Sequence, residues 1–165
     1  MRKLLTIMTV AVLAIAAAAQ VAITKVDKVA PTDEMFIDMA VTAAETAVEQ
    51  GKKPCGAVVI LNGAWRSTGM ADDNTTAEES AIARSRRTSL RSAAIYTVNQ
   101  PTTEALNAIA RSGADAVYFV NPAADVIAAG IYPAEAFDAA ATDTTVTPVP
   151  MIQLDYAPAH KFVKK

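Results

Sequence analysis

Two short stretches decide the fold of this chain. The first runs from Asn74 to Ile82 and reads N-T-T-A-E-E-S-A-I, and the second runs from Gln100 to Ile109 and reads Q-P-T-T-E-A-L-N-A-I. In both, threonine and glutamate residues come directly before small apolar residues, which is typical of the N-terminus of a helix. Pro101 is expected at the first helical position of the second stretch, where proline loses no hydrogen bond. We expect each stretch to open a helix.

A capping box is expected at the first of these helices. Glu78 follows Thr75 by three residues, and this T-x-x-E spacing lets each side chain accept from the other's backbone N–H group. We therefore interpret Glu78 first as a capping residue, with proton transfer as its alternative role. Thr76 and Glu79 have the same spacing and offer an alternative box.

Alternating apolar runs and turn residues predict the rest of the fold. Asn62-Gly63 between two such runs is a strong hairpin signal. Strands are expected over residues 54–61, 64–70, 93–98, 115–120 and 151–154, the last at an edge of the sheet. Helices are expected from a capping Thr32 to residue 50 and over 75–90, 101–112, 122–129, 133–141 and 157–163. This order predicts an α/β fold, a three-layer α/β/α sandwich with a mixed sheet of about five strands.

Residues 1–19 have the pattern of a secretory signal peptide. Arg2 and Lys3 form a basic start, an apolar run follows, and Ala17-Ala18-Ala19 is a small-residue cleavage site. A single transmembrane anchor is the alternative, because the uncharged stretch is about long enough to span a bilayer. We expect cleavage and a periplasmic or secreted location. The remaining chain is expected to comprise a linker over residues 20–32 and one domain over residues 33–165.

Charge and cysteine content restrict the classes of partner. The chain carries 15 Lys and Arg residues and 17 Asp and Glu residues, a net charge of −2. Removal of residues 1–19 takes away Arg2 and Lys3, so 13 basic residues remain against 17 acidic ones, a net charge of −4. A nucleic-acid partner is not expected, because phosphate affinity needs a net basic face. The single cysteine forbids an intramolecular disulfide, and no membrane partner is expected after signal cleavage.

The order of these segments resembles the cytidine deaminase-like superfamily, and within it the branch of guanine deaminases and tRNA adenosine deaminases. The resemblance runs from about Phe36 to the C-terminus. The segments that carry it are Pro54–Val59, Thr76–Glu78 with Ala81-Ile82, Ala94–Thr97, Pro101, Ala108-Ile109, Val117–Phe119, Asp125–Tyr132 and Pro150–Leu154. It implies the same α/β fold, and by analogy with active relatives it makes a homodimer an option.

The resemblance also implies that both helices point their first turns into one shared pocket, and that this pocket is remodelled. In active relatives a His in H-x-E and two Cys in P-C-x-x-C hold zinc, and the Glu moves protons between the zinc-bound water and the base. The ligand positions here carry Thr76, Thr102 and Ala105, which are poor zinc ligands or none, so no zinc and no other cofactor is expected. Ala71 stands where the family carries its substrate-binding asparagine. The pocket positions by family match are Ala71, Thr76, Glu78, Pro101, Thr102 and Ala105.

Further polar groups have a functional and a structural interpretation each. A set of carboxylates offers ligands for a hard cation, although turns and helix starts are acid-rich in any case; its members are Asp72, Asp73, Glu78, Glu79 and Glu104. A basic run offers a surface for phosphate or an acidic partner, or is a solvated helix end; its members are Arg84, Arg86, Arg87 and Arg91. Cys55 is expected to be a buried structural thiol, and His160 is expected to have no ligand or catalytic role.

Three functions from different classes stay open. We expect an exported, non-catalytic deaminase-like protein that binds a small molecule or a protein partner. The first alternative is a divergent deaminase-type hydrolase of nucleobases or nucleosides that uses Glu78 with another metal or with none. The second alternative is a secreted effector domain, against which the missing zinc ligands count.

Overall fold

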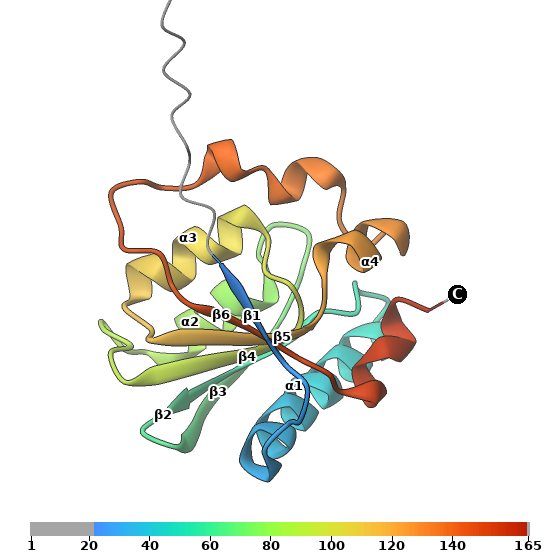
Figure 1. Cartoon of the computed structure of the whole chain (residues 1–165), viewed down its shortest axis with the longest axis horizontal. Coiled ribbons are helices and arrows are strands. Elements are labelled where there is room, and N and C mark those ends of the chain that lie inside the picture. The colour runs from blue at the N-terminus through green and yellow to red at the C-terminus, as the bar shows by residue number, and fades with distance from the viewer. Residues whose placement is uncertain (1–21, 165) are drawn as a thin grey trace, which may run out of the picture.

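The computed structural model describes residues 22–164 (Figure 1). The strands are β1 (Ile23–Val26), β2 (Gly56–Leu61), β3 (Ala64–Met70), β4 (Ala93–Asn99), β5 (Ala116–Asn121) and β6 (Met151–Leu154). The α-helices are α1 (Pro31–Glu49), α2 (Ala77–Ser85), α3 (Thr103–Ser112) and α4 (Ala123–Ala128). Short 3₁₀ helices follow toward the C-terminus, η1 (Ala134–Phe137), η2 (Ala139–Ala141) and η3 (Ala157–Phe162). Within residues 22–164 no helix has the length and apolar character needed to cross a membrane. The expected signal peptide, residues 1–19, lies outside the described residues.

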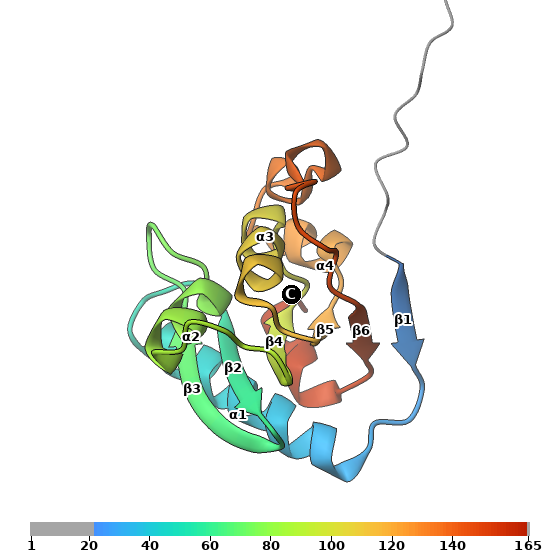
Figure 2. The ribbon, with the colours of Figure 1, turned by 90° about the vertical axis from the view of Figure 1, so that its left-hand side faces the viewer.

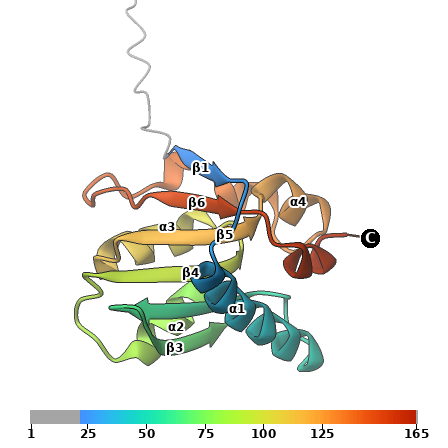
Figure 3. The same ribbon diagram turned by 60° about the horizontal axis from the view of Figure 1, so that its bottom comes forward.

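The strands form one mixed six-stranded sheet in the order β1-β6-β5-β4-β2-β3. The pairs β1–β6, β6–β5 and β5–β4 are parallel, whereas β2 is antiparallel to both β4 and β3. Figure 3 shows β1 and β3 at the two opposite edges of the sheet. The Asn62-Gly63 hairpin is confirmed, because both residues adopt the positive φ angles, 53° and 76°, that a tight two-residue turn between β2 and β3 requires.

Each face of the sheet carries its own apolar core. Side chains of successive strand residues point to opposite faces, so on β2 Val58 packs with α1 while Val59 packs with the core that contains α2 and α3. The same alternation holds along the rest of the buried run Gly56–Leu61. Figures 1 and 2 show α1 and η3 on one face and α2 and α3 on the other. The expected α/β fold with helices on both faces of a mixed sheet is therefore confirmed.

Two glycines set how closely the helices approach the sheet. A Cβ atom on Gly56 would lie 2.3 Å from the carbonyl oxygen of Ala40 in α1, and one on Gly69 would lie 2.2 Å from the carbonyl oxygen of Ala77 in α2. Both contacts are with backbone atoms, which cannot move aside as a flexible side chain can. Glycine at position 69 therefore fixes the first turn of α2 directly against β3.

Aromatic side chains fasten α1 to the sheet. The Tyr96 hydroxyl donates a hydrogen bond of 2.6 Å to Asp33 Oδ1 in the first turn of α1. The Tyr96 ring stacks on Tyr118 with centroids 4.6 Å apart and meets Phe36 at 5.3 Å. The N-cap of α1 is Ala30, without a side-chain cap, so the expected capping role of Thr32 is wrong. Pro31 fills the first helical position instead.

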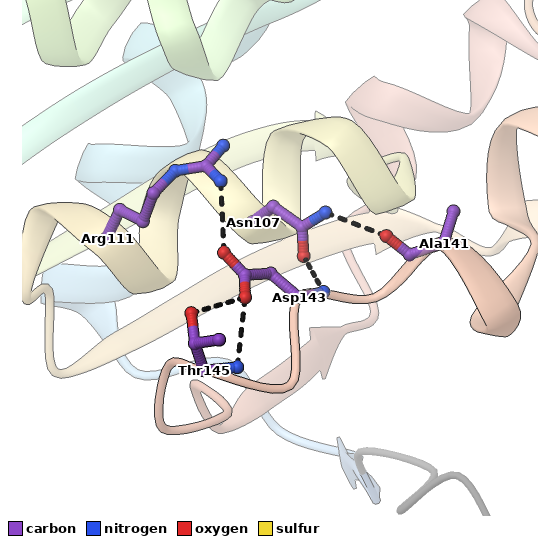
Figure 4. A network of polar contacts seen from close by, with 5 residues as sticks. All are labelled: Asn107, Arg111, Ala141, Asp143 and Thr145. Atoms are coloured by element: carbon purple, nitrogen blue, oxygen red, sulfur yellow. Dashed lines mark hydrogen bonds and ion pairs between the residues drawn. The ribbon is translucent and has the colours of Figure 1, made fainter.

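A polar network fastens the Thr-rich C-terminal segment to α3 (Figure 4). Asn107 Nδ2 donates to the Ala141 carbonyl at 3.0 Å, and its Oδ1 accepts from the Asp143 N–H at 2.8 Å. Arg111 Nη1 pairs with Asp143 Oδ2 at 3.2 Å, and Asp143 Oδ1 accepts from the Thr145 hydroxyl at 2.6 Å. The segment after η2 is thus held on α3 by side-chain hydrogen bonds and an ion pair, without regular secondary structure of its own.

The sheet differs from the expectation at the N-terminus. The expected linker over residues 20–32 contains β1, which pairs in parallel with β6 from Ile23–Met151 to Val26–Leu154. The sheet therefore has six strands rather than about five, and β6 lies inside it rather than at an edge. Four residues are too few to show a strand period, so this pairing depends on a partner far along the chain.

Two helix boundaries also differ. The helix expected over residues 75–90 is α2, which ends at Ser85 because Arg86 adopts a left-handed conformation with φ 53°. The N-cap of α3 is Thr102, so Pro101 precedes the helix instead of opening it. The second stretch therefore begins its helix two residues later than expected.

Candidate functional site

The two stretches come together at one end of the sheet. β3 and β4 run in the same direction, since each is antiparallel to β2, and α2 follows β3 as α3 follows β4. Both helices therefore begin at the same end, and they pack against each other. Thr76, Glu78, Thr102 and Ala105 are all buried there, at 6%, 6%, 5% and 0% exposure. The expectation of two helix N-termini at one buried place is met by this arrangement.

The capping box of α2 is the alternative one. Thr76 is the N-cap, and the Glu79 N–H donates to its Oγ1 at 3.2 Å, while the Thr76 N–H donates to Glu79 Oε2 at 2.9 Å. The interpretation of Glu78 as a capping residue is wrong, because the cap lies one residue later than Thr75. Glu78 takes the second helical position and points into the protein.

Glu78 meets a hydroxyl from the neighbouring strand. Its Oε1 lies 2.6 Å from Thr97 Oγ1 on β4. The same Thr97 oxygen lies 3.3 Å from the carbonyl oxygen of Gly56, which only accepts. The single hydrogen of the Thr97 hydroxyl is donated to Glu78, to Gly56, or shared between them. A protonated Glu78 that donates to Thr97 leaves that hydrogen free for Gly56 and satisfies both contacts as full hydrogen bonds.

Burial acts in the same direction. It raises the pKa of Glu78 above its ordinary value, and this effect outweighs the hydrogen bonds that Thr97 and the helix backbone donate to the ionised carboxylate, which lower the pKa. The neutral acid is therefore favoured over a wider pH range than for an exposed glutamate. In its neutral form the Glu78 carboxyl group can donate a hydrogen bond as well as accept one.

Cys55 is buried beside Glu78, as a structural thiol is expected to be. Asn99 Nδ2 lies 3.5 Å from its Sγ and donates at 3.0 Å to the carbonyl oxygen of Pro54. Burial raises the pKa of Cys55 to about 11, and the carboxyl group of Glu78 adds to the rise. Hydrogen bonds from Tyr132 and Asn99 oppose it. Cys55 is therefore a thiol, not a thiolate, at neutral pH.

Tyr132, in the segment after α4, lies over Cys55 and hydrogen-bonds to it. Burial, followed by the nearby Cys55, raises its pKa far above the ordinary value, so its hydroxyl stays protonated. Lys53 Nζ lies 4.5 Å from the centroid of the Tyr132 ring, and Phe137 meets the ring edge-on at 6.5 Å. The Tyr132 ring thus lies between the Lys53 ammonium group and the buried Cys55.

Hydrogen bonds between the side-chain amides of Asn99 and Asn121 connect the site to the C-terminal segment. Asn121 Nδ2 donates to Asn99 Oδ1 at 3.1 Å and to the Ala159 carbonyl at 3.0 Å. These bonds leave Asn121 Oδ1 as the acceptor facing His160 Nδ1 at 3.2 Å, while His160 Nε2 faces Asp155 Oδ1 at 3.2 Å. His160 therefore has a definite structural position, which its place in the C-terminal tail does not indicate.

A surface pocket opens next to the buried group. It measures about 280 Å³ and is lined by Gly51, Lys52, Lys53, Ala71, Asp72 and Asp73. The Ala71 N–H donates to the Cys55 carbonyl at 3.4 Å, and Lys53 reaches over Tyr132, so the pocket wall and the buried site share residues. Of the positions expected in the pocket from the family match, Ala71 lines this surface pocket, whereas Thr76, Glu78, Pro101, Thr102 and Ala105 do not.

The remaining expected residues serve α3 or face solvent. Thr102 Oγ1 accepts from the Ala105 N–H at 3.2 Å as an N-cap, and Thr103 Oγ1 donates to the Asp138 carbonyl at 3.0 Å. Asp72, Asp73 and Glu104 are exposed, whereas Glu78 is buried, so the five carboxylates do not form one ligand set. In the part of the chain that the structure describes, no three His, Cys, Asp or Glu side chains lie close enough together to hold a metal ion.

Known structures share this fold. A structure from studies of tRNA:A34 deaminases, which edit A to I at the wobble position of transfer RNA, has 20% identity and a TM-score of 0.60 over 78% of this chain and 98% of its own. Guanine deaminase from Bacillus subtilis has 29% identity and a TM-score of 0.55 over 65% of this chain and 71% of its own. A protein solved in complex with 8-azaguanine has 15% identity and a TM-score of 0.65 over 79% and 81%.

These likenesses define the class of protein. The chain has the cytidine deaminase-like fold, with tRNA adenosine deaminase and guanine deaminase among its structural neighbours, as the sequence resemblance predicts. No protein-family model matches the sequence, and no curated protein matches it. The fold is therefore established by the three-dimensional comparison, while the chemistry of the site depends on its own residues.

Sequence reasoning missed four members of the site: Thr97, Asn99, Asn121 and Tyr132. The one available signal was the polar residue at or near the end of each apolar strand, Thr97 and Asn99 on β4 and Asn121 on β5. These parallel strands end side by side, with Asn99 opposite Asn121. Tyr132 lies in an irregular segment, and no local pattern indicates where it folds.

Proposed function

We propose that this chain is an exported deaminase-like protein that holds no zinc, does not deaminate, and binds a small polar molecule at its remodelled pocket. The described residues do not fit zinc. A catalytic zinc needs three protein ligands of the imidazole, thiolate or carboxylate type plus a water. The matching positions offer two threonines and an alanine.

One observation carries this proposal: the threonine hydroxyl groups at two of the three matching ligand positions cap helices. Thr76 Oγ1 accepts from the Glu79 N–H, and Thr102 Oγ1 accepts from the Ala105 N–H. Each accepts from a backbone N–H group that a helix N-terminus otherwise leaves unsatisfied, which stabilises the helix. Ala105 has no polar side-chain atom and is fully buried.

The chemistry of the interior supports binding rather than hydrolysis. Cys55 and Tyr132 are protonated at neutral pH, and the contacts of Thr97 favour a protonated Glu78. Cys55 and Tyr132 then supply no general base, and a protonated Glu78 supplies none either. Lys52, Lys53, Asp72 and Asp73 line the adjacent pocket and offer charged partners to a small polar ligand. A protein partner at the same face is the competing form of this proposal.

A divergent hydrolase is the second candidate, and the position of Glu78 favours it. Glu78 is free of any capping role and is buried with a raised pKa, which suits a residue that gives and takes a proton. Such an enzyme would use Glu78 with another metal or with none.

The two candidates are separated by an ammonia-release assay over purine and pyrimidine bases and nucleosides, with and without added divalent metals. We expect no release above the background. A thermal-shift series over the same compounds is expected to show stabilisation by at least one of them, because a ligand that binds only the folded state raises its stability. Release that is lost in Glu78→Gln but kept in Glu79→Gln would support the hydrolase and overturn the proposal.

A further inference from the structure

Four exposed arginines gather where α2 ends beside the edge strand β3. They are Arg66, Arg84, Arg86 and Arg87, called the arginine patch below. Arg66 Nε donates to the Ser85 carbonyl at 3.1 Å, and Arg84 Nη1 donates to the Thr68 carbonyl at 3.4 Å. These two bonds join the strand and the helix end, so the arginines from both elements lie together.

Two irregular backbone conformations, one at Arg66 and one at Arg86, set the direction of these side chains. Ser67 pairs with Val59 and Trp65 with Ile60, so Arg66 is the extra residue of a β-bulge, a feature that redirects a side chain. Arg86 adopts φ 53° after the last turn of α2, where α3 has Gly113 at φ 80°. Glycine is favoured at this position, since it takes the left-handed conformation without steric strain. Position 86 thus carries an arginine where glycine is expected to give a more stable protein.

The charge of the patch is not neutralised within the protein. Between Ser80 and Thr103 the sequence has no Asp or Glu, although the whole chain has a net charge of −2. Across residues 22–164, none of the four guanidinium groups forms an ion pair, in contrast to Arg111, which pairs with Asp143. The carboxylate that faces the following turn is Asp115, which accepts from the Ser92 N–H at 3.3 Å.

We propose that the arginine patch binds the phosphate groups of an anionic phospholipid surface. The planar guanidinium fork matches a phosphate group with two parallel hydrogen bonds, and a cluster of four or more such cations is enough for peripheral attraction to anionic lipids. The exposed Trp65 beside Arg66 lies against α1, where it lines a pocket with Met39 and Thr46. No aromatic residue occurs between Ser80 and Ile95, so the α2 side of the patch lacks the stacking platform that single-stranded nucleic acid uses. This contact needs no inserted segment, but it replaces the expectation that the mature chain has no membrane partner. It is independent of the function proposed for the pocket.

The test uses sedimentation of the purified mature protein with vesicles of phosphatidylcholine alone or with phosphatidylglycerol added. Arg86→Gln with Arg87→Gln removes two charges whose side chains make no hydrogen bond among the described residues. We expect the partition onto anionic vesicles to fall by about 30-fold, about fivefold for each arginine. Lys25→Gln with Lys28→Gln removes the same charge at the opposite, β1 edge of the sheet and is expected to have a much smaller effect. Added salt is expected to weaken binding of the wild-type protein.

A second variant separates binding from folding. Arg86→Gly relieves the left-handed strain, so it is expected to keep or raise the melting temperature while it lowers binding to anionic vesicles. The proposal is wrong if both charge pairs reduce binding equally, or if neutral vesicles bind the protein as well as anionic ones do. It is also wrong if an RNA oligonucleotide binds through the patch while anionic vesicles do not.

Discussion

Glu78 Oε1 lies 2.6 Å from Thr97 Oγ1, which joins the first turn of α2 to the end of β4 inside the protein. Thr97 in turn faces the carbonyl oxygen of Gly56 at 3.3 Å. This chain of three groups is satisfied by a protonated Glu78. These contacts link α2, β4 and β2 inside the protein.

The first prediction concerns the pH dependence of stability. The folded-state pKa of Glu78 is raised above 4.5, its ordinary value. Above that value the native state binds more protons than the unfolded state, so the free energy of unfolding falls as pH rises, by about 1.4 kcal/mol per pH unit until the native carboxyl group ionises. Glu78→Gln keeps a donor for Thr97 and removes the titration. Urea unfolding at a series of pH values should show the variant gaining on the wild type as pH rises. Parallel curves would show that Glu78 ionises alike in both states.

A second prediction assigns the helix cap. Thr76→Ala removes the side chain that accepts from Glu79 N–H and should lower the free energy of unfolding by about 0.5–2 kcal/mol. Thr75→Ala, one residue earlier, removes no capping hydrogen bond and serves as the matched control. Denaturant titration measures both. A greater loss in Thr75→Ala would return the cap to the position first expected.

The third prediction concerns thiol reactivity. Burial and a pKa of about 11 keep Cys55 as an unreactive thiol at neutral pH. Labelling with a chromogenic thiol reagent at pH 8 should be slow in the native protein and complete after unfolding in guanidinium. Tyr132→Ala removes the covering ring and should speed the native reaction. Fast labelling of the native wild-type protein would contradict the burial of Cys55.

The fourth prediction tests the network of Figure 4. Asn107→Ala removes two hydrogen bonds that hold the segment after η2 on α3. Amide hydrogen exchange over residues 139–146 should become faster, with little change in the β-sheet. Arg111→Gln removes only an exposed ion pair and should have a smaller effect. Equal effects of both variants would assign the restraint to Asp143 instead.

The fifth prediction is that a zinc site can be rebuilt. Thr102 and Ala105 are the N-cap and third residue of α3, and Thr76 is the N-cap of α2 at the same end of the sheet. Thr76→His, Thr102→Cys and Ala105→Cys together should bind zinc through three ligands plus water, and each single reversion should weaken binding sharply. Circular dichroism checks that the variant folds. A folded triple variant that takes up no more zinc than the wild type would show that these residues do not converge.

Much of the fold could be predicted because its signals are local. The Asn62-Gly63 turn, the buried run of β2 and the strands β4 and β5 all lie where short-range patterns place them. β1 could not be predicted, since its pairing with β6 is a contact between residues more than a hundred positions apart. The end of α2 was also missed, because Arg86 gives no glycine signal for the left-handed turn.

The candidate site was predictable only in part. The resemblance located Thr76, Glu78, Thr102 and Ala105, all of which are buried where α2 and α3 begin. It did not determine the role of Glu78, because Thr75 and Thr76 offer two capping boxes that differ by one residue. Glu78 meets Thr97 on β4, nineteen residues along the chain, and such a contact carries no local signal.

The zinc content of the purified wild-type protein tests the central claim most directly. Protein produced with added zinc, treated with a chelator and dialysed, is analysed for metal and protein together. Thr76 and Thr102 supply hydroxyls that already cap helices, and Ala105 supplies no ligand, so the ratio of zinc to protein should be close to zero. About one zinc per chain that survives chelation would contradict the proposed loss of the metal site.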